Sequence, residues 1–450
     1  MRICCQLSGV YFIIISYNIW ENIHFVDNIT NYFKKHLSKK SINKIKNSDL
    51  FIFAWKFVNN YFLNQWITHK RYRSEPLSFD GKLGSNLIGF MDVPSGIGAA
   101  AHSSELAMKA AGLPVNVVNI NLNNSSNLGR DRVTNFNKPI NSNNQINLIQ
   151  ANPPEYPILW RHLGKSLLVR KYNIGVWYWE LMNLPNDWIK SFQVLDEIWA
   201  ATRFIQETIQ KNSPVPVIKI PPCVNVELDL SLTRNDFLLP ENAFLFLCTF
   251  DVRSICERKN PLAAVKAFKK AFQANDSAVG LVIKVNNSTF NSEEIIQIKN
   301  EIRDYANCYL INDTYSKIKF NSLVNLVDAF VSLHRAEGFG LILAEAMFLG
   351  KPVIATNWSG NTDFMTPDNS CPVDYKLIPV KPGLSPYQSG QVWADADISH
   401  ASHFMNKLCS DHGFYNEISV NARESIIKNF LPEKIGNIMK KRLEEIYGQL

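Results

Sequence analysis

The chain has 450 residues, and this length excludes a single ordinary hydrophobic core, so two domains are expected. With 46% hydrophobic, 19% charged and 12% aromatic residues, its composition is that of a globular protein. Its 47 Lys and Arg against 40 Asp and Glu give a formal net charge of +7, and residues 1–80 hold 11 and 5 of these, or +6. This basic region suits anionic lipid or phosphate groups, although a solvated basic helix face explains the charge equally well.

The eight cysteines contain no CxxC pair and no paired spacing, and most lie in apolar contexts such as FLCTF. Such cysteines are ordinary small core residues. A reducing compartment and no metal site are therefore expected.

The segment at residues 3–20 is the only candidate for targeting. Polar residues such as Gln6 and Asn18 interrupt it, and its apolar run is far shorter than the ~20 residues of a membrane span. It has no small-residue cleavage site, so it does not resemble a signal peptide. A buried or membrane-surface element fits better, and the protein is expected to be cytoplasmic.

Residues 21–75 place apolar side chains at helical spacing, which predicts a basic, mainly helical extension over residues 1–80. A different pattern begins near residue 84. The sequence SNLIGFMDVPSGIGAAAHSSELAMKAAGLPVNVVNI predicts a strand, a glycine-containing loop, a helix and a second strand, which form one βαβ unit. The Asn-rich residues 119–147 follow and are expected to be a surface loop.

Alternation of strands and helices then continues along the chain, interrupted by a Pro-rich segment and a polar segment at 232–242. Repeated alternation indicates parallel sheets covered by helices on both faces. We therefore predict an α/β fold with two doubly wound, Rossmann-like domains that face a cleft, over residues 84–235 and 241–415. Residues 416–450 are expected to form amphipathic helices that pack back toward the N-terminal domain.

The sequence HRAEGFGLILAEAMFLGKPVIATNWSGNTDF begins at His334, where a predicted strand ends. A helix is expected to begin near Leu341 and to stop at Gly350, so that Glu337–Gly340 forms the turn between strand and helix. Such a turn faces the ligand crevice of an open α/β sheet. Its free amides and the positive end of the helix suit a phosphate, and its glycines let a ligand approach the backbone.

Glu337 and Glu345 flank this predicted phosphate site. An ionised carboxylate can accept two hydrogen bonds from a vicinal diol, so the pair suggests a ligand with sugar, phosphate and sugar in a row. A nucleotide sugar is such a molecule. Two glutamates eight residues apart also occur by chance, and the spacing is informative only within this strand, turn and helix.

A second group of residues lies in FDVRSICERKNPLAAVKAFKKAF. Arg253 and Lys259 are expected on a loop at the crevice edge, where they would neutralise a diphosphate leaving group. Asn260 is expected to cap the next helix and Pro261 to be its first residue. Arg258 fits a solvated loop cation better than the other two do. Because no acidic metal cluster is evident, these cations are expected to replace a metal ion.

These motifs resemble those of retaining glycosyltransferases of family 4, which have the two-domain GT-B fold, over roughly residues 84–450. The most specific parts are the R-x5-K loop and the E-x7-E signature. The resemblance implies that Arg253 and Lys259 hold the donor diphosphate and act in catalysis with Glu337, which would contact the transferred hexose. It implies that Glu345 grips the ribose diol.

The resemblance also assigns donor binding to two glycine-containing turns. Their residues are Gly96 and Gly98 of the PSGIG loop, and Gly338, Phe339, Gly340 and Leu341 of the EGFGL turn. Asp363 stands where the family has an acidic residue after a pair of glycines, although here the pair is Ser359 and Gly360.

The acceptor side gives a weaker signal. Glu180 in VWYWELMNLP follows a predicted strand and would touch either acceptor or donor sugar, while a structural carboxylate beside aromatic residues is an equal alternative. His102 and His162 lie near candidate loops but fit ordinary polar residues better.

The resemblance implies a metal-independent, retaining hexosyltransferase of polysaccharide biosynthesis. It would move a hexose from a nucleotide diphosphate sugar to a carbohydrate or lipid-linked glycan, with no cofactor and no nucleic acid partner. A non-catalytic nucleotide-sugar-binding protein of the same fold is the alternative. A dinucleotide oxidoreductase would need G-x-G-x-x-G and a later acid, whereas PSGIGAAA has Ala101 at the third glycine position.

Residues 1–80 lie outside the resemblance. Their cations and their aromatic residues, including Trp20, Trp55 and Trp66, suit the interface of an anionic membrane. Peripheral docking at the inner face of a membrane and packing as extra helices on the N-terminal domain both remain open.

Overall fold

The computed structural model describes residues 3–7, 10–14, 49–71, 83–93, 95–123, 132–135, 144–252, 254–286 and 293–449. They divide into two compact units, Met1–Asn64 and Gln65–Leu450. In the first unit, β1 (Ile3–Leu7) pairs with β2 (Val10–Ile14) as an antiparallel hairpin. Helix α3 (Asp49–Arg71) begins in the first unit and ends in the second.

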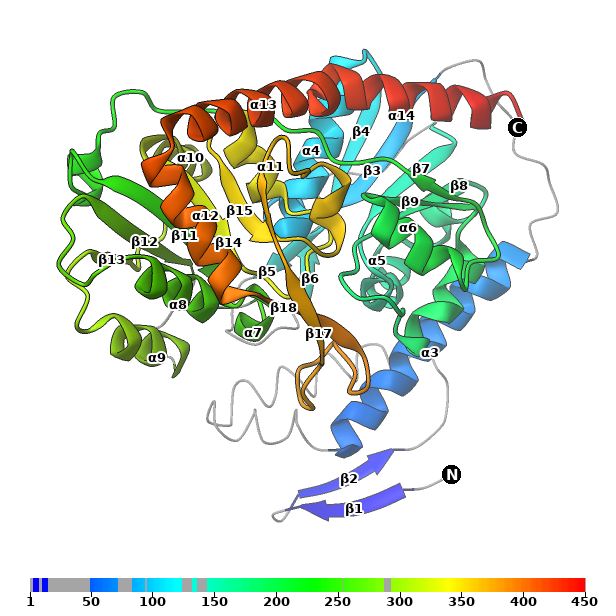
Figure 1. Cartoon of the computed structure of the whole chain (residues 1–450). Coiled ribbons are helices and arrows are strands. Elements are labelled where there is room, and N and C mark those ends of the chain that lie inside the picture. The colour runs from blue at the N-terminus through cyan, green and yellow to red at the C-terminus, as the bar shows by residue number, and fades with distance from the viewer. Residues whose placement is uncertain are drawn as a thin grey trace. The chain divides into compact units, whose positions relative to one another are not determined.

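The second unit contains two six-stranded parallel sheets (Figure 1). The N-terminal sheet has the strand order β10-β9-β8-β7-β3-β4. Its strands are β3 (Ser85–Gly89), β4 (Val115–Asn119), β7 (Ile146–Gln150), β8 (Tyr172–Trp177), β9 (Glu197–Ala200) and β10 (Val217–Lys219). Its helices are α4 (Gly96–Ala110), α5 (Tyr156–Leu168) and α6 (Arg203–Gln210), and a hairpin of β5 (Asn121–Asn123) and β6 (Arg132–Asn135) follows β4.

The C-terminal sheet has the order β13-β12-β11-β14-β15-β16. Its strands are β11 (Phe244–Asp251), β12 (Val279–Asn286), β13 (Cys308–Ile311), β14 (Ala329–Ser332), β15 (Val353–Thr356) and β16 (Cys371–Val373). Its helices are α7 (Cys256–Lys259), α8 (Pro261–Ala271), α9 (Glu293–Ile302), α10 (Lys317–Leu326), α11 (Leu341–Phe348) and α12 (Ile398–Ser410). The prediction of two doubly wound α/β domains is confirmed.

In both sheets the order of the strands reverses beside the first strand, while all the strands remain parallel. The chain builds outward from β3 to β4 and then returns to place β7 on the other side of β3. In the same way β12 and β14 lie on opposite sides of β11. Loops at the carboxyl ends of the two strands diverge at such a switch point, and ligands of open α/β sheets bind there.

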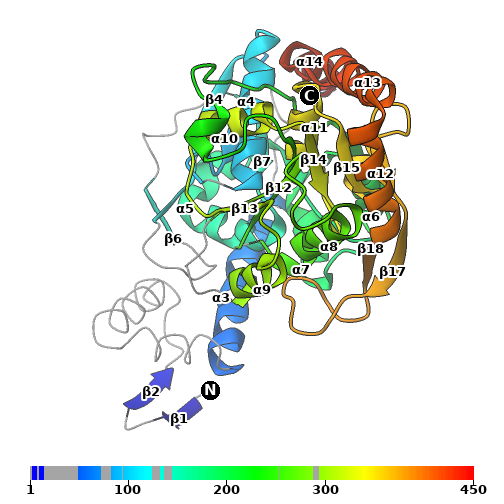
Figure 2. The same ribbon diagram turned by 60° about the vertical axis from the view of Figure 1, so that its left-hand side comes forward.

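The strands of the C-terminal sheet are nearly continuous apolar runs because both faces are buried. Phe246, Leu281 and Val331 of this sheet are almost fully buried, in one core with Phe268 of α8 and Met405 of α12. Figure 2 shows α8 and α12 beside one another against the sheet. This packing fixes the strands whose carboxyl ends carry the candidate site.

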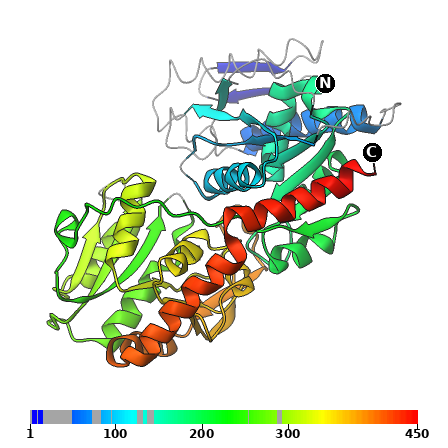
Figure 3. The ribbon, with the colours of Figure 1, turned by 90° about the horizontal axis from the view of Figure 1, so that it is seen from above.

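The C-terminal helices cross from one sheet domain to the other. Helix α13 (His412–Phe430) packs against α11, and α14 (Pro432–Tyr447) packs against α4 of the N-terminal domain (Figure 3). Arg442 of α14 lies 2.5 Å from the buried carboxylate of Glu197. A charge buried at 0% exposure needs such a partner, so the pair holds α14 on the N-terminal sheet.

The end of α3 belongs to the core of the second unit. Trp66 is 0% exposed and its ring stacks at 6.0 Å from that of Trp160 and lies 5.5 Å from Tyr156. At Trp66 the structure agrees with packing on the N-terminal domain, the second of the two alternatives for residues 1–80, because these aromatic residues bury the indole. Trp20 and the side chain of Trp55 lie outside the described residues.

Within the described residues, no helix has the length and apolar character needed to cross a membrane.

Candidate functional site

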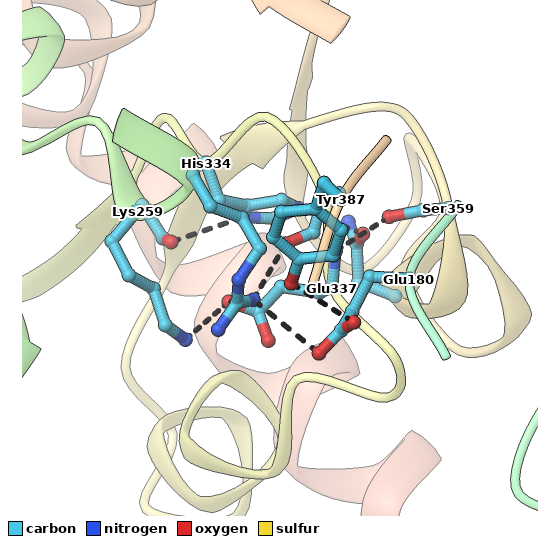
Figure 4. Close-up of polar contacts among 10 residues, drawn as sticks. Glu180, Lys259, His334, Glu337, Ser359 and Tyr387 are labelled. Carbon is cyan, nitrogen blue, oxygen red and sulfur yellow. Dashed lines mark hydrogen bonds and ion pairs between the residues drawn. The ribbon is translucent and has the colours of Figure 1, made fainter. Parts of the chain in front are cut away.

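The switch point of the C-terminal sheet brings two distant segments together. Helix α7 follows β11 and carries Arg258 and Lys259, and the turn that holds Glu337 follows β14. The Lys259 ammonium donates a hydrogen bond to Glu337 Oε1, and Arg258 lies 3.3 Å from the same oxygen (Figure 4). Lys259 and Glu337, which the sequence placed in one site, are therefore in contact.

The carboxylate of Glu337 is buried, with 9% exposure. Burial by itself raises the pKa of Glu337, but Lys259 and Arg258 outweigh it and hold this pKa at about 2. The carboxylate is therefore ionised at neutral pH. It can accept hydrogen bonds from hydroxyl groups, and it is not a proton donor.

Arg258 is a functional candidate that the sequence did not identify. It was expected to be a solvated cation, yet it is only 8% exposed, donates to the carbonyl of Ala336 at 2.8 Å and lies 4.0 Å from Glu180. Burial opposes its charge, but Tyr387, Glu337 and Glu180 raise the pKa of Arg258. The expectation was wrong because the short helix α7 turns this guanidinium toward a carbonyl and two carboxylates.

Helix α7 also places Lys259 and Asn260 differently from the prediction. Lys259 ends α7 and does not lie on a loop. Asn260 has φ 51° and precedes Pro261, the first residue of α8, but its side chain does not cap that helix. It donates to the carbonyl of Leu333 at 3.0 Å, which ties the α7–α8 junction to the end of β14. Arg253, the other predicted cation, lies outside the described residues.

The turn after β14 presents free backbone donors. Helix α11 begins at Leu341 as predicted, and Gly350 after its end has φ 71°, the left-handed conformation of a helix stop. In the part of the chain that the structure describes, no group accepts a hydrogen bond from the amides of Gly338, Phe339, Gly340 and Leu341. Unpaired amides next to the start of a helix are the kind of donors to which anions bind in proteins.

Glu345 lies on α11, with 3% exposure. Lys317, the first residue of α10, donates a hydrogen bond to its Oε2 at 2.5 Å. Burial raises the pKa of Glu345, and the ammonium of Lys317 offsets part of this effect. Lys317 stands 28 residues before its partner, and no sequence signal connects the two.

The predicted glycine loop of the N-terminal domain lies at the carboxyl end of β3. Gly96 begins α4 and a Cβ atom there would meet no atom within 4 Å. A Cβ at Gly98 would collide with the carbonyl oxygen of Val93, so this glycine is required by the loop itself. Ser95 caps the helix by accepting a hydrogen bond from the amide of Gly98 at 3.2 Å.

Glu180 follows β8 and contacts the C-terminal domain. Its Oε2 accepts a hydrogen bond from the hydroxyl of Tyr387 at 3.0 Å (Figure 4). Tyr387 lies in the loop between β17 (Tyr375–Pro379) and β18 (Val392–Ala396), and its ring is 5.5 Å from that of Trp179. Glu180 thus has a structural partner and also lies beside Arg258, the partner of Glu337.

His102 and His162, which fitted ordinary polar residues better than site residues, lie as follows. Nε2 of His102 lies 2.7 Å from the carbonyl oxygen of Met91. His162 is exposed on α5.

Asp363 joins the two sheet domains beside the turn. Its carboxylate accepts hydrogen bonds at 3.0 Å from the amide of Arg203 and from Lys219. Thr202, the residue before α6, donates to the carbonyl of Gly338 at 3.2 Å. The start of α6 is therefore held against the turn of the candidate site.

His334 follows β14, in the segment that leads to Glu337, and is fully buried. Its ring nitrogens are 3.0 Å from Ser332 Oγ and 3.0 Å from Asn361 Oδ1, which fits a neutral ring that accepts from the serine and donates to the amide oxygen. Burial, together with Lys259 and Arg258, lowers the pKa of His334 to about 4, although Glu337 opposes this.

The chain is similar to known proteins in one of its domains and in its fold. Residues 239–371 match the family model described as "Glycosyl transferases group 1". No curated protein matches the chain in sequence. Sucrose-phosphate synthase from Thermosynechococcus elongatus superposes with a TM-score of 0.60 at 14% identity, over 82% of this chain and 100% of that chain.

Two further solved structures resemble the chain. HepE of Anabaena, in complex with UDP and glucose, gives a TM-score of 0.56 at 12% identity, over 81% of this chain and 100% of that chain. A TarM mutant of S. aureus, with fondaparinux, alpha-GlcNAc-glycerol and UDP, gives 0.49 at 15% identity, over 66% of this chain. The chain spans 55% of that TarM chain. The fold is therefore GT-B, and within it residues 239–371 match the model of glycosyl transferases group 1.

The buried neutral imidazole of His334 makes a prediction about pH. The unfolded chain binds a proton near pH 6.5 and the folded chain only near pH 4, so stability is lost as the pH falls through this window. The loss approaches about 3 kcal/mol at its lower end. We expect the melting temperature of His334→Gln to fall less between pH 7 and pH 4.5 than that of the wild type.

The exposed His403 supplies the control. His403→Gln should keep the wild-type dependence of melting temperature on pH. Equal slopes for wild type and His334→Gln would contradict the assignment of a neutral, buried His334.

Proposed function

We propose that the chain is a retaining hexosyltransferase that moves a hexose from a nucleotide diphosphate sugar to a carbohydrate or lipid-linked glycan. The reaction uses neither a metal ion nor a cofactor. One observation carries the proposal: an ionised, buried carboxylate, Glu337, lies between two cations and directly precedes a turn with free amides. The match to glycosyl transferases group 1 and the structure of HepE with UDP and glucose support the donor class.

Each part of the site binds one part of the nucleotide diphosphate sugar. The amides of Gly338–Leu341 and the start of α11 bind the diphosphate, with Lys259 beside them. By the family resemblance Arg253 joins Lys259, and Gly96 and Gly98 approach the donor from the N-terminal domain.

The two glutamates bind the sugars of the donor. Glu337 accepts hydrogen bonds from hydroxyl groups of the hexose, since its pKa of about 2 keeps it ionised. Glu345 accepts hydrogen bonds from the ribose diol in place of, or beside, its present bond from Lys317. Glu180 lies on the acceptor side of this group.

The reaction follows from this arrangement. The bond between the anomeric carbon and the phosphate oxygen breaks, and the acceptor hydroxyl oxygen bonds to the same face of that carbon. The acceptor proton passes to the departing phosphate. Negative charge grows on the diphosphate as this bond breaks, and the fixed ammonium of Lys259 stabilises it more in the transition state than in the ground state.

The first test measures donor binding and turnover in wild type and Lys259→Ala. A nucleotide diphosphate sugar should raise the melting temperature of both proteins, while the turnover of Lys259→Ala in transfer or donor hydrolysis should fall by about 10²–10³. Lys266→Ala, an exposed lysine on α8, is the matched control and should keep wild-type turnover.

The outcomes of this test separate the alternatives. Near-normal turnover by Lys259→Ala would remove this residue from the catalytic set. A wild-type protein that binds donor without turnover would be the non-catalytic binding protein. A wild-type protein that binds no nucleotide diphosphate sugar would overturn the proposed function.

A second prediction concerns Glu345. Glu345→Gln should raise the KM for donor about tenfold at nearly constant kcat, because a ribose contact is made equally in the ground state and the transition state. Glu293→Gln, at an exposed position on α9, should change neither constant. A collapse of kcat at unchanged KM would mean that Glu345 acts on the reacting centre.

We also propose that the enzyme works in the cytoplasm, at the inner face of a membrane. The support is the charge of residues 1–80, with 11 Lys and Arg against 5 Asp and Glu. Each cation near an anionic membrane contributes about 1 kcal/mol, so a few suffice for reversible docking. The burial of Trp66 leaves this role to the cations and to other aromatic residues.

Vesicle co-sedimentation tests this location. The full chain should bind vesicles that contain anionic lipid at low salt and leave them at high salt. A variant with Gln in place of four clustered lysines, at Lys34, Lys35, Lys39 and Lys40, should bind more weakly. Equal binding by both proteins, or by neither, would refute docking through this region.

A further inference from the structure

Ser359 has a backbone conformation that a serine rarely adopts. Its φ is 74° and its ψ is −145°. Leu238 and Asn260 also have positive φ, but with ψ of 38° and 49° they lie in the left-handed helical region. The combination at Ser359 lies near the region that only glycine populates readily, so serine is strained there. Such strain persists only where the surrounding contacts compensate for it.

The side chain of Ser359 has one contact that glycine could not make. Its Oγ accepts a hydrogen bond at 2.9 Å from the amide of Glu337 (Figure 4). Ser359 is only 3% exposed, so without the hydroxyl this buried amide would lose its acceptor. The contact joins the loop after β15 to the residue whose carboxylate lies in the candidate site.

The next residue holds the other side of the same backbone. The amide of Gly360 donates to the carbonyl of Glu337 at 2.9 Å. A Cβ at Gly360 would collide with the carbonyl oxygen of Gly338, so the two segments are in direct backbone contact. Ser359 and Gly360 therefore hold both peptide groups that flank the Cα of Glu337.

The loop that carries Ser359 is itself fixed. Thr362 donates from its hydroxyl to the carbonyl of Ser359 at 2.7 Å. Asp363, at the end of the same loop, accepts hydrogen bonds from Arg203 and Lys219 of the N-terminal domain. These hydrogen bonds hold in place the loop that carries the Ser359 hydroxyl.

We propose that Ser359 is a positioning residue for Glu337, and that serine is kept in a glycine conformation for this purpose. The hydroxyl fixes the backbone from which the Glu337 carboxylate extends toward Lys259. It thereby sets the position of that carboxylate relative to the free amides of Gly338–Leu341. The inference rests on the proposed function, because it assigns the effect of Ser359 to the hexose contact of Glu337.

Two substitutions separate positioning from stability. Ser359→Gly removes the hydroxyl and also the strain, whereas Ser359→Ala removes the hydroxyl and keeps the strain. We expect both variants to lose about tenfold in kcat, with the KM for donor changed less than twofold, because a displaced carboxylate weakens contacts in the transition state. The melting temperature should be unchanged or raised in Ser359→Gly and lowered in Ser359→Ala.

Ser370→Ala is the matched control. It removes a buried serine hydroxyl that donates to the carbonyl of Thr366 at 2.6 Å and contacts neither Ser359 nor Glu337, so it should lower the melting temperature and keep wild-type kcat. A purely structural role for Ser359 predicts that activity follows stability, and wild-type kcat in Ser359→Gly would refute positioning. Wild-type protein is assayed in parallel, because absence of its turnover would refute the proposed function and not this inference alone.

Discussion

The pairing of a buried carboxylate with two cations at the switch point of the C-terminal sheet constrains the rest of this structure. A carboxylate with the burial of Glu337 loses several kcal/mol of hydration, and the cost is met only where partners are held at contact distance. Lys259 and Arg258 are held there by α7, whose position depends on β11 lying directly beside β14. The ionised state of Glu337 therefore depends on the strand order and on the short helix α7.

The same cluster connects the two sheet domains. Arg258 lies between Glu337 of the C-terminal domain and Glu180 of the N-terminal domain, and Tyr387 bonds to Glu180. Asp363 holds the start of α6, and α14 binds the N-terminal sheet through Arg442. Groups that would bind the acceptor are thus mechanically linked to groups that would bind the donor.

Three residues of the site are held in states that lower the stability of the folded protein. His334 is buried in its neutral form, Glu345 is buried with a raised pKa, and Ser359 has a strained backbone. Each cost lies within the loops after β14 and β15 or on α11, next to the turn with free amides. Strain and buried charge that gather around one turn are typical of a site selected for activity and not for stability.

The two doubly wound domains, the turn after β14 and the start of α11 at Leu341 could be predicted from the sequence. These features follow from local patterns, because apolar periodicity, glycines and helix ends act over a few neighbouring residues. Tertiary structure alone decided that Arg258 is buried, that Lys317 binds Glu345, and that Tyr387 meets Glu180 from 207 residues away. Strand order sets such contacts between distant segments, and a single sequence contains no local signal of which side chains will meet.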